Sequence, residues 1–248
     1  MILIGICGQP AGGKSAVSAI LQRLGAVWIN ADRIAHEVLA NSTVIDQLVM
    51  RFGRAILDAD GKIDRPTLGR IVFGDDDAAK NALRYLESVV HPETRDRMKA
   101  EIAIAIQKNL PVVVLDVPLL IESQWDVWCD EIWFIDTPRQ TVVRAAKERG
   151  WSVEMLDKRI SNQFGIDEKR RLSTRIIDNH GSLEQLEATV GAWWQQAVGS
   201  INGSSQTPSK DATNQDAVLV AAQERLAKLM ATADPGGQHC RDRLLHKL

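Results

Sequence analysis

A glycine-rich segment near the amino terminus restricts the fold of this chain more than any other feature. Residues Gly8 to Ser15, GQPAGGKS, match the pattern G-x-x-x-x-G-K-[ST] at every required position. In this pattern successive backbone N–H groups point at phosphate oxygens, and glycine allows the dihedral angles that such a loop needs. A short apolar run, residues 2–7, precedes the loop, and a helical pattern with one apolar face follows it. The segment therefore predicts a phosphate-binding loop (P-loop) between a buried strand and a helix.

This predicted P-loop gives each of its residues an expected role. The residues expected to bind the nucleotide are those of the loop and of the first helical turn: Gly8, Gln9, Pro10, Ala11, Gly12, Gly13, Lys14, Ser15 and Ala16. We expect Lys14 to reach the β- and γ-phosphates as a catalytic group, and the Ser15 hydroxyl to be a ligand of Mg²⁺. A chance match is the alternative, but the strand before the loop and the helix after it argue against chance. GTPases, motor ATPases and kinases share this loop, so it does not identify the reaction.

Apolar strands alternate with helices along the first 200 residues. Besides residues 2–7, the pattern predicts strands at residues 26–29, 112–116, 131–135 and 175–178. Helices are expected at residues 15–24, 32–40, 44–52, 76–90, 92–106 and 183–197, with a charged helical region from about 139 to 172. The strands are far enough apart for crossover connections. The fold class is therefore α/β, with a parallel sheet of the P-loop NTPase type flanked by helices.

The composition changes near Gly199. Residues 1–199 are expected to form the catalytic domain. Residues 200–216 are polar and rich in turn-forming residues, which predicts a flexible linker. Residues 217–248 are expected to be a helical tail of unknown role. A loosely packed helix is the simpler interpretation of this tail, and a partner-binding segment is the alternative.

Charge and cysteine content exclude several classes of protein. The formal net charge of −2 gives no general attraction to nucleic acid or to an anionic membrane. The three cysteines match no metal-ligand spacing, and their odd number suits a reducing compartment. No signal peptide and no apolar run long enough to span a membrane is present. We expect a cytoplasmic protein that is a monomer or a weak homo-oligomer and has no nucleic-acid or membrane partner.

Asp32 is a candidate general base. It lies just after the predicted strand 26–29, so it should emerge at the carboxyl edge of the sheet, as the P-loop does. A carboxylate there could accept the proton of an attacking hydroxyl group. The alternative role is to cap the helix that follows, which either Asn30 or Asp32 could do. The two roles are compatible.

Two further features allow both a functional and a structural interpretation. The region of residues 139–172 is rich in arginine and lysine, which fits a lid that closes over the transferred phosphate. Acidic residues are interspersed, so a solvated pair of amphipathic helices is the alternative. His91 and Arg95 are one helical turn apart and could share one face, but a single histidine is more often structural.

Several segments, in chain order, resemble the dephospho-CoA kinase family. The resemblance covers about residues 1–200 and depends on all of these motifs together. They are GICGQPAGGKS, NADRIAH (30–36), FGRAILDADGKIDRPTLGRIVF (52–73), His91-Pro92 with Arg95, DVPLLIE (116–122), Arg159-Ile160 with Gln163, and Ile177-Asp178-Asn179. The run of residues 52–73 is the most specific of them.

This resemblance implies a reaction and an architecture. Members of the family transfer a phosphate group from Mg-ATP to the 3′-hydroxyl of dephospho-CoA, the last step of coenzyme A synthesis. The chain would then be a phosphotransferase with an alcohol acceptor, and its small-molecule substrates would be ATP and dephospho-CoA. The implied fold is like that of nucleoside-monophosphate kinases. It has a P-loop core, a helical acceptor-binding region at about residues 44–106 and a lid at about residues 139–172.

The resemblance also implies roles for residues outside the P-loop. Asp32 would be the catalytic base, and Arg144 would be a catalytic arginine of the lid. Asn179 would lie near the adenine of ATP. The residues implied to contact the acceptor are Asp32, His91, Arg95, Leu119, Leu120 and Arg159. The family usually has a second lid arginine four residues after the first. Glu148 occupies that position here, which leaves Arg149 or no residue in this role.

Other classes of P-loop protein make different predictions. The main alternative is a kinase that acts on another nucleoside or small-molecule hydroxyl group. A regulatory or motor NTPase would hydrolyse nucleotide without an acceptor, and usually has an apolar strand that ends in Asp-Glu. Here the corresponding strand ends in Leu115-Asp116-Val117-Pro118. A module that only binds nucleotide is the third possibility, and it predicts that changing Asp32 has no effect.

Overall fold

The computed structural model describes residues 1–74, 76–203 and 227, which belong to two compact units. Of these residues, 1–29, 101–203 and 227 form the first unit, here called the sheet unit. Residues 30–74 and 76–100 form the second, here called the helical unit. Most of the predicted linker and tail lies outside the described residues, so the division of the chain at residue 199 stays a prediction.

The sheet unit contains a five-stranded parallel sheet, which confirms the predicted fold class. Its strands are β1 (Ile2–Gly8), β2 (Val27–Asn30), β3 (Val112–Asp116), β4 (Glu131–Asp136) and β5 (Arg175–Asp178). They lie in the order β2-β3-β1-β4-β5. The central strand β1 pairs in parallel with β3 on one side and with β4 on the other, and β4 pairs with β5. All the predicted strands are present, within two residues of their expected bounds.

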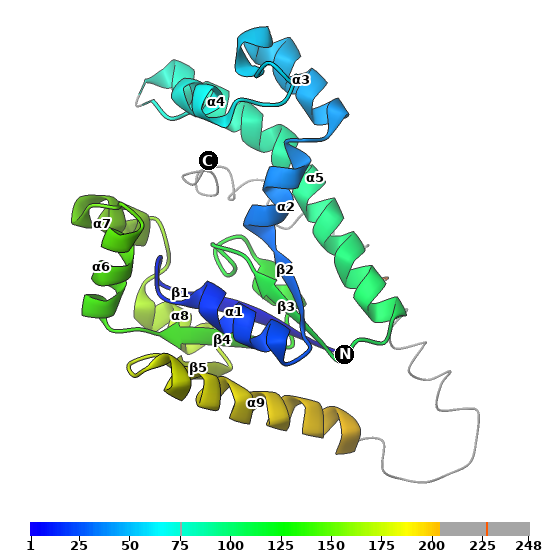
Figure 1. Cartoon of the computed structure of the whole chain (residues 1–248), viewed down its shortest axis with the longest axis vertical. Helices are drawn as coiled ribbons and strands as arrows, with labels where there is room; N and C mark the ends of the chain where they lie inside the picture. The colour runs from blue at the N-terminus through cyan, green and yellow to red at the C-terminus, as the bar shows by residue number, and fades with distance from the viewer. Residues whose placement is uncertain (75, 204–226, 228–248) are drawn as a thin grey trace. The chain divides into compact units, whose positions relative to one another are not determined.

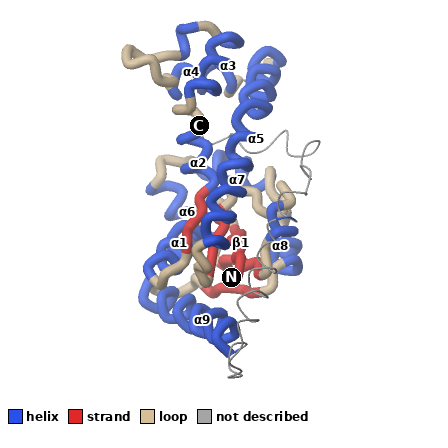
Figure 2. Tube along the Cα trace, turned by 90° about the vertical axis from the view of Figure 1, so that its right-hand side faces the viewer, coloured by secondary structure: helices blue, strands red, loops and turns tan. Residues whose placement is uncertain are grey.

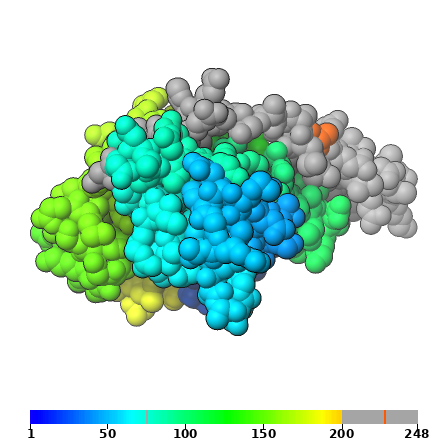
Figure 3. Space-filling view, turned by 90° about the horizontal axis from the view of Figure 1, so that it is seen from above, coloured from blue at the N-terminus to red at the C-terminus, as the bar shows by residue number. Residues whose placement is uncertain are grey.

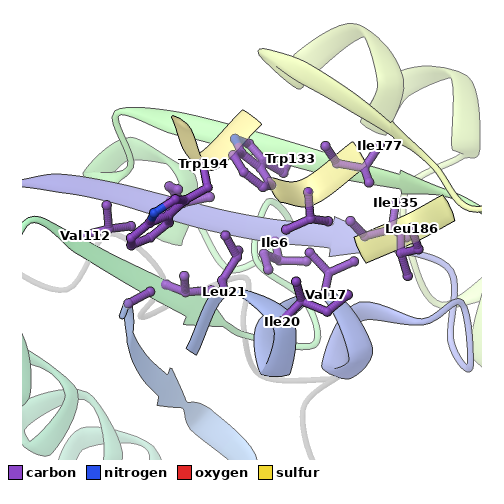
Figure 4. Close-up of a cluster of buried hydrophobic side chains, with 14 residues drawn as sticks. Ile6, Val17, Ile20, Leu21, Val112, Trp133, Ile135, Ile177, Leu186 and Trp194 are labelled. Atoms are coloured by element: carbon purple, nitrogen blue, oxygen red, sulfur yellow. The ribbon is translucent and has the colours of Figure 1, made fainter. Parts of the chain in front are cut away.

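Alternate residues of β1 point to opposite faces of the sheet. Ile4 and Ile6 face α1 (Lys14–Arg23) and α9 (Leu183–Gly203), two helices that contact each other. Figure 4 shows Val17 and Leu21 of α1 meeting the strands and α9 in one apolar cluster. The cluster also includes Ile20, Val112, Trp133, Ile135, Ile177, Leu186, Val190 and Trp194. Burial of these side chains fixes the helix that carries the P-loop against the sheet.

The other face of β1 carries Gly5 and Cys7. A Cβ atom at Gly5 would lie 2.6 Å from the Cys129 sulfur and 2.6 Å from Leu120 Cδ2, so only glycine fits here. Cys7 lies 3.4 Å from the Ser173 hydroxyl, at the end of α8 (Ile166–Leu172). Burial raises the pKa of the Cys7 thiol, which therefore stays protonated at neutral pH. The segment after β3 and helix α8 thus cover this face (Figure 1).

The helical unit consists of helices joined by loops (Figure 2). Its helices are α2 (Ala31–Val38), α3 (Ser42–Phe52), the short 3₁₀ helix η1 (Arg54–Ile56), α4 (Arg65–Val72) and most of α5 (Asp77–Gln107). Each carries buried apolar side chains, among them Ile34, Val38, Leu48, Ile56, Leu68 and Leu86. Both α3 and α4 contact η1, and their side chains form adjoining parts of one face in Figure 3.

Helix α5 differs from the prediction of two helices at residues 76–90 and 92–106. A proline lacks the N–H group that a helix interior needs. The structure shows one helix from Asp77 to Gln107 with Pro92 inside it. Apolar side chains are buried on both sides of the proline, at Val90 and Met98. Their burial favours a continuous helix over the local preference of proline for a helix end.

The motif of residues 52–73 folds into η1, a tight turn and α4. Leu57 and Ile63 form an isolated antiparallel bridge, and the Asp58 N–H donates to the Lys62 carbonyl at 2.8 Å. The Asp58 carboxylate accepts from the N–H groups of Asp60 and Lys62 at 2.9 Å each. An Asp side chain that bonds to the backbone two residues later stabilises such a turn. The most specific motif in the sequence is therefore also a compact local structure.

The charged region of residues 139–172 forms three helices in the sheet unit. They are α6 (Arg139–Glu148), α7 (Val153–Ser161) and α8. Helix α6 contacts α7, whereas α8 contacts β1 and β4 (Figure 1). The opposite charges in this region form specific ion pairs, as between Arg139 and Asp157.

A buried ion pair fixes α8 to the segment after β3. Lys169 Nζ lies 3.0 Å from Glu122 Oε1, and both side chains are less than 5% exposed, at 3% and 4%. The ammonium also donates to Gln163 Oε1 at 2.7 Å, and Glu122 Oε1 accepts from the Phe164 N–H at 2.8 Å. These bonds replace part of the hydration that both charges lose on folding.

We expect Lys169→Met to lower the free energy of unfolding by about 3–5 kcal/mol, because it leaves the Glu122 carboxylate buried without its cation. Urea denaturation measures this loss. The matched control is Arg23→Met, which breaks the exposed pair of Arg23 and Glu187 and should cost no more than about 1 kcal/mol. Equal losses in the two variants would contradict this account of the buried pair.

Candidate active site

The predicted P-loop lies between β1 and α1 in the sheet unit and requires glycine at several positions. Gly13 has a φ of 84°, and a Cβ atom there would lie 2.7 Å from the Asn179 amide nitrogen. At Gly12 a Cβ atom would lie 2.9 Å from the Gln9 carbonyl oxygen. Ala11 also has a positive φ, 57°. The loop therefore has the backbone conformation that the G-x-x-x-x-G-K-[ST] pattern predicts. Side chains at Gly12 and Gly13 would collide with neighbouring atoms.

The N-terminus of α1 suits an anion. Its cap residue is Gly13, which has no side chain that could cap the helix. The first turn of α1 contains no acidic residue. The first N–H groups of a helix lack intrahelical partners and stand at the positive end of its dipole. Phosphate oxygens are the natural partners for such groups. The residues present thus fit a nucleotide phosphate chain.

Lys14 and Ser15 follow the loop in the first turn of α1. Lys14 Nζ donates to the carbonyl oxygens of Gly8 at 3.2 Å and Gln9 at 2.9 Å, so the ammonium lies over the loop. Ser15 is exposed. A serine hydroxyl supplies the hard oxygen ligand that Mg²⁺ prefers, with water and phosphate oxygens as the other ligands. Among the described residues no cluster of three or more His, Cys, Asp or Glu side chains could hold a metal ion.

Thr137 connects the P-loop to the ends of β4 and β5. Its hydroxyl donates to the Gly12 carbonyl at 2.8 Å and accepts from the Asn179 amide at 3.0 Å. Its carbonyl accepts from the Gln9 side chain at 3.1 Å. Thr137 is buried, and so is Gln9. Thr137 is not among the residues predicted from the sequence, where its one signal is its position directly after a strand.

Asn179 lies beside the P-loop, and its contact with the adenine of ATP stays a prediction. Its backbone N–H donates to the Asp136 carbonyl at 2.9 Å, which continues the pairing of β4 and β5 by one residue. Its side-chain amide faces Gly13 and Thr137. The segments after β1, β4 and β5 thus bring together Gly13, Thr137 and Asn179, which are far apart in sequence.

In the helical unit, Asp32 lies in the first turn of α2. The cap of this helix is Asn30, whose side chain accepts from the Arg33 N–H at 2.8 Å. The structure therefore assigns capping to Asn30, so Asp32 is not needed for that role. Asp32 is half-buried.

His36 and Arg65 accompany Asp32. His36 is one helical turn after Asp32, and its Nε2 atom lies 2.9 Å from an Arg65 guanidinium nitrogen. Burial and the Arg65 charge lower the pKa of His36, whereas Asp32 acts in the opposite direction. A neutral imidazole can therefore accept the Arg65 hydrogen bond. Neither residue is among those predicted from the sequence, although His36 lies in the segment NADRIAH and Arg65 in the run of residues 52–73.

His91 and Arg95 both lie on α5, one turn apart, as predicted. Burial and the neighbouring Arg95 charge lower the pKa of His91 to about 4. The buried Nε2 atom of His91 has no hydrogen-bond partner among the described residues. His91 is thus a neutral imidazole at physiological pH, with one buried ring nitrogen that is unpaired among the described residues.

The low pKa of His91 predicts a pH-dependent stability. The unfolded chain binds a proton at this residue below about pH 6.5, whereas the folded protein does so only near pH 4. Stability should therefore fall as the pH decreases from about 6.5 to 4, by up to about 3 kcal/mol. Chemical denaturation of the wild type and of His91→Gln across this range measures the effect. The variant should lose less stability than the wild type, and parallel curves would disprove the prediction.

The other predicted residues lie in the sheet unit. Arg144 is exposed on α6, and the half-buried Arg159 lies on α7. Leu119 and Leu120 are buried after β3. Leu120 packs against the backbone of β1 at Gly5, which gives it a structural role. Its contact with an acceptor stays a prediction.

Comparison with known proteins identifies the family. The family model described as "Dephospho-CoA kinase" matches residues 2–185, most of the chain. The chain belongs to this family. The match includes the P-loop, all five strands and the run of residues 52–73, so the resemblance noted in the sequence is confirmed.

Individual relatives agree with this family. A dephospho-CoA kinase of Rhodopirellula baltica is 42% identical over 188 residues, which are 76% of this chain and 87% of the relative. One of Symbiobacterium thermophilum is 42% identical over 205 residues, 82% of this chain and 84% of the relative. Among solved structures, a Thermus thermophilus protein is 33% identical in sequence, with a TM-score of 0.64. The alignment covers 79% of this chain and 97% of the Thermus protein. A dephospho-CoA kinase of Campylobacter jejuni is 25% identical, with a TM-score of 0.57. That alignment covers 79% of this chain and 96% of the Campylobacter protein.

Within the described part of the chain, no helix has the length and apolar character needed to cross a membrane.

Proposed function

We propose that this protein transfers the γ-phosphate of ATP to the 3′-hydroxyl of dephospho-CoA, which gives coenzyme A and ADP in the last step of coenzyme A synthesis. The observation that carries the proposal is the dephospho-CoA kinase family match over residues 2–185. The P-loop between β1 and α1 supports a nucleotide as the phosphate donor.

In the proposed reaction the P-loop residues Gly8 to Ala16 hold the phosphates of ATP. Lys14 offsets negative charge on the β- and γ-phosphates, and the Ser15 hydroxyl would hold Mg²⁺. When bound, Mg²⁺ neutralises charge on the phosphate oxygens. Asn179, held beside Gly13 by Thr137, contributes to the adenine end of the site.

The proposal also gives roles to residues outside the P-loop. Asp32 accepts the proton of the 3′-hydroxyl as that oxygen attacks phosphorus. The residues proposed to contact the acceptor besides Asp32 are His91, Arg95, Leu119, Leu120 and Arg159. Arg144 on α6 offsets the charge on the transferred phosphate as a lid residue. The cytoplasmic location, the weak or absent oligomerisation and the lack of a nucleic-acid partner stay predictions.

The proposal is tested by measuring ADP release from Mg-ATP with and without dephospho-CoA. We expect ADP release that depends on dephospho-CoA. Adenosine and shikimate serve as alternative hydroxyl acceptors and should give no release above background. Release that needs no acceptor would instead indicate an NTPase, and a preference for another acceptor would indicate a different P-loop kinase.

A further inference from the structure

The end of α6 fixes the position of Trp151. The Gly150 N–H donates to the Lys147 carbonyl at 2.9 Å, and the Trp151 N–H donates to the Ala146 carbonyl at 3.0 Å. Gly150 has a φ of 75°, in the left-handed region. These two bonds form a Schellman motif, in which the residue after the glycine packs on the last turn of the helix. The backbone therefore directs the Trp151 side chain back onto α6.

Trp151 joins an apolar cluster that includes a P-loop residue. The buried members of this cluster are Ala11, Val142, Ala146 and Leu156, and Trp151 packs against them. Ala11 comes from the P-loop, whereas the others come from α6 and α7. The position of the Trp151 ring is thus linked through apolar contacts to the loop proposed to hold the ATP phosphates.

The Trp151 ring also contacts two arginines of the predicted lid. The Arg159 Cζ atom lies 4.3 Å from the ring centroid, and that of Arg149 lies 5.8 Å from it. Both distances lie within the range of cation–π attraction, and the shorter one is the stronger contact. Arg159 is half-buried, whereas Arg149 is exposed. One aromatic ring therefore brings two positive charges together at the C-terminal end of α6.

Arg159 differs from Arg139 and Arg170 in how its charge is balanced. Arg139 pairs with Asp157, and Arg170 pairs with Asp136 at 2.6 Å. Within residues 1–74, 76–203 and 227, Arg159 forms no hydrogen bond and no ion pair. The contact with the Trp151 ring face uses none of the guanidinium N–H groups in a hydrogen bond, so these groups can bind a ligand. A phosphate group is a strong partner for these N–H groups, because it can accept two parallel hydrogen bonds.

We propose that Trp151 is a positioning residue, which holds the Arg159 guanidinium by stacking so that its N–H edge binds a phosphate group of one of the two substrates. Arg149 is placed by the same ring as a second, weaker contributor. A stacked ring holds the cation without neutralising its charge, whereas a carboxylate partner would neutralise it. The inference rests on the proposed function, because only that reaction supplies phosphate groups from both ATP and dephospho-CoA.

The test compares three variants of the full chain in steady-state kinetics. Trp151→Leu keeps an apolar side chain in the cluster but removes the aromatic face, and we expect kcat/KM to fall about tenfold. Trp151→Phe keeps an aromatic face and should restore most of this loss. Arg159→Lys keeps the charge and leaves the cluster intact but loses the planar guanidinium, so it should resemble Trp151→Leu. The substrate whose KM rises, ATP or dephospho-CoA, identifies the source of the phosphate group.

A double-mutant cycle separates positioning from a merely structural role. If Trp151 acts through Arg159, Trp151→Leu should have little further effect in an Arg159→Ala background. The matched control is Trp193→Leu, since Trp193 stacks on Arg175 at 4.4 Å in the same unit, and Arg175 is paired with Glu131. The control should affect stability without changing KM for either substrate. An equal effect of Trp151→Leu in both backgrounds, or unchanged kinetics in Trp151→Leu and Arg159→Lys, would overturn the inference.

Equilibrium binding of ATP and of dephospho-CoA, each alone, distinguishes this inference from the proposed function. If the wild type binds a substrate but does not phosphorylate dephospho-CoA, the proposed function fails. Weaker binding of that substrate by Trp151→Leu and Arg159→Lys would still support the positioning role. Normal turnover by the wild type together with unaltered binding and kinetics in both variants would reject only the positioning role.

Discussion

Asp32→Asn should lower kcat by at least about 10²-fold while ATP affinity stays nearly unchanged. The amide keeps the size and the position of the side chain but cannot accept a proton from the attacking hydroxyl group. The structure makes this substitution informative, because Asn30 and not Asp32 caps α2. The helix should therefore persist in the variant, at a cost of less than about 1 kcal/mol from the lost charge near its N-terminus.

Steady-state kinetics and ATP titration of Asp32→Asn provide the measurement. The matched control is Glu37→Gln on the same helix, which removes an exposed carboxylate paired with Arg33 and should leave kcat unchanged. An unaltered kcat in Asp32→Asn would eliminate Asp32 as the base. A parallel loss of kcat in both variants would instead point to the integrity of α2.

Lys14→Ala should weaken both ATP binding and turnover. The ammonium lies over the P-loop, where it bonds to the carbonyl oxygens of Gly8 and Gln9. Loss of a charged group that contacts the transferred phosphate typically lowers kcat by about 10²–10³-fold. Loss of a charge-assisted hydrogen bond weakens binding by about 1.5–3 kcal/mol, or roughly 10- to 150-fold in Kd.

Calorimetric titration with ATP and kinetic assays of Lys14→Ala measure both effects, and a thermal melt verifies that the variant folds. The control is Lys108→Ala, which removes an exposed lysine of the same unit that lies after α5. It should behave like the wild type. Normal ATP affinity and turnover in Lys14→Ala would contradict the assignment of the P-loop.

Local sequence patterns were sufficient to predict the sheet. Strands β1, β3 and β4 are short apolar runs, and burial on both faces of a parallel sheet requires such runs. The P-loop was equally predictable, because its glycines meet a backbone requirement that the structure shows at Gly12 and Gly13. In both cases the structural cause acts within a few neighbouring residues.

The continuity of α5 could not be predicted from local preferences. Proline usually ends a helix, so the pattern indicated a break before Pro92. Burial of Val90 and Met98 depends on tertiary packing, which the sequence does not reveal. Tertiary contacts here override a local signal.

The contacts that organise the candidate site join residues distant in sequence. Thr137 bonds to Gly12, which is 125 residues away, and His36 contacts Arg65, 29 residues away. Threonine after a strand and histidine within a helix are common, so neither stands out by type or spacing. The stacking of Arg159 on Trp151 depends similarly on the turn at Gly150, whose geometry only the structure shows. The position of Asp32 after a predicted strand suggested its role as a base, whereas the family resemblance supplied the expected role of Arg159. The experiments above test both roles.

The most direct test of the proposed reaction is to identify its product. Dephospho-CoA is incubated with Mg-ATP and the protein, and the product is analysed by mass spectrometry and by two-dimensional ¹H–³¹P NMR. The account predicts a gain of one phosphate group whose phosphorus couples to the ribose H3′ proton. An unchanged mass, or a new phosphate coupled to H2′ instead, would contradict it.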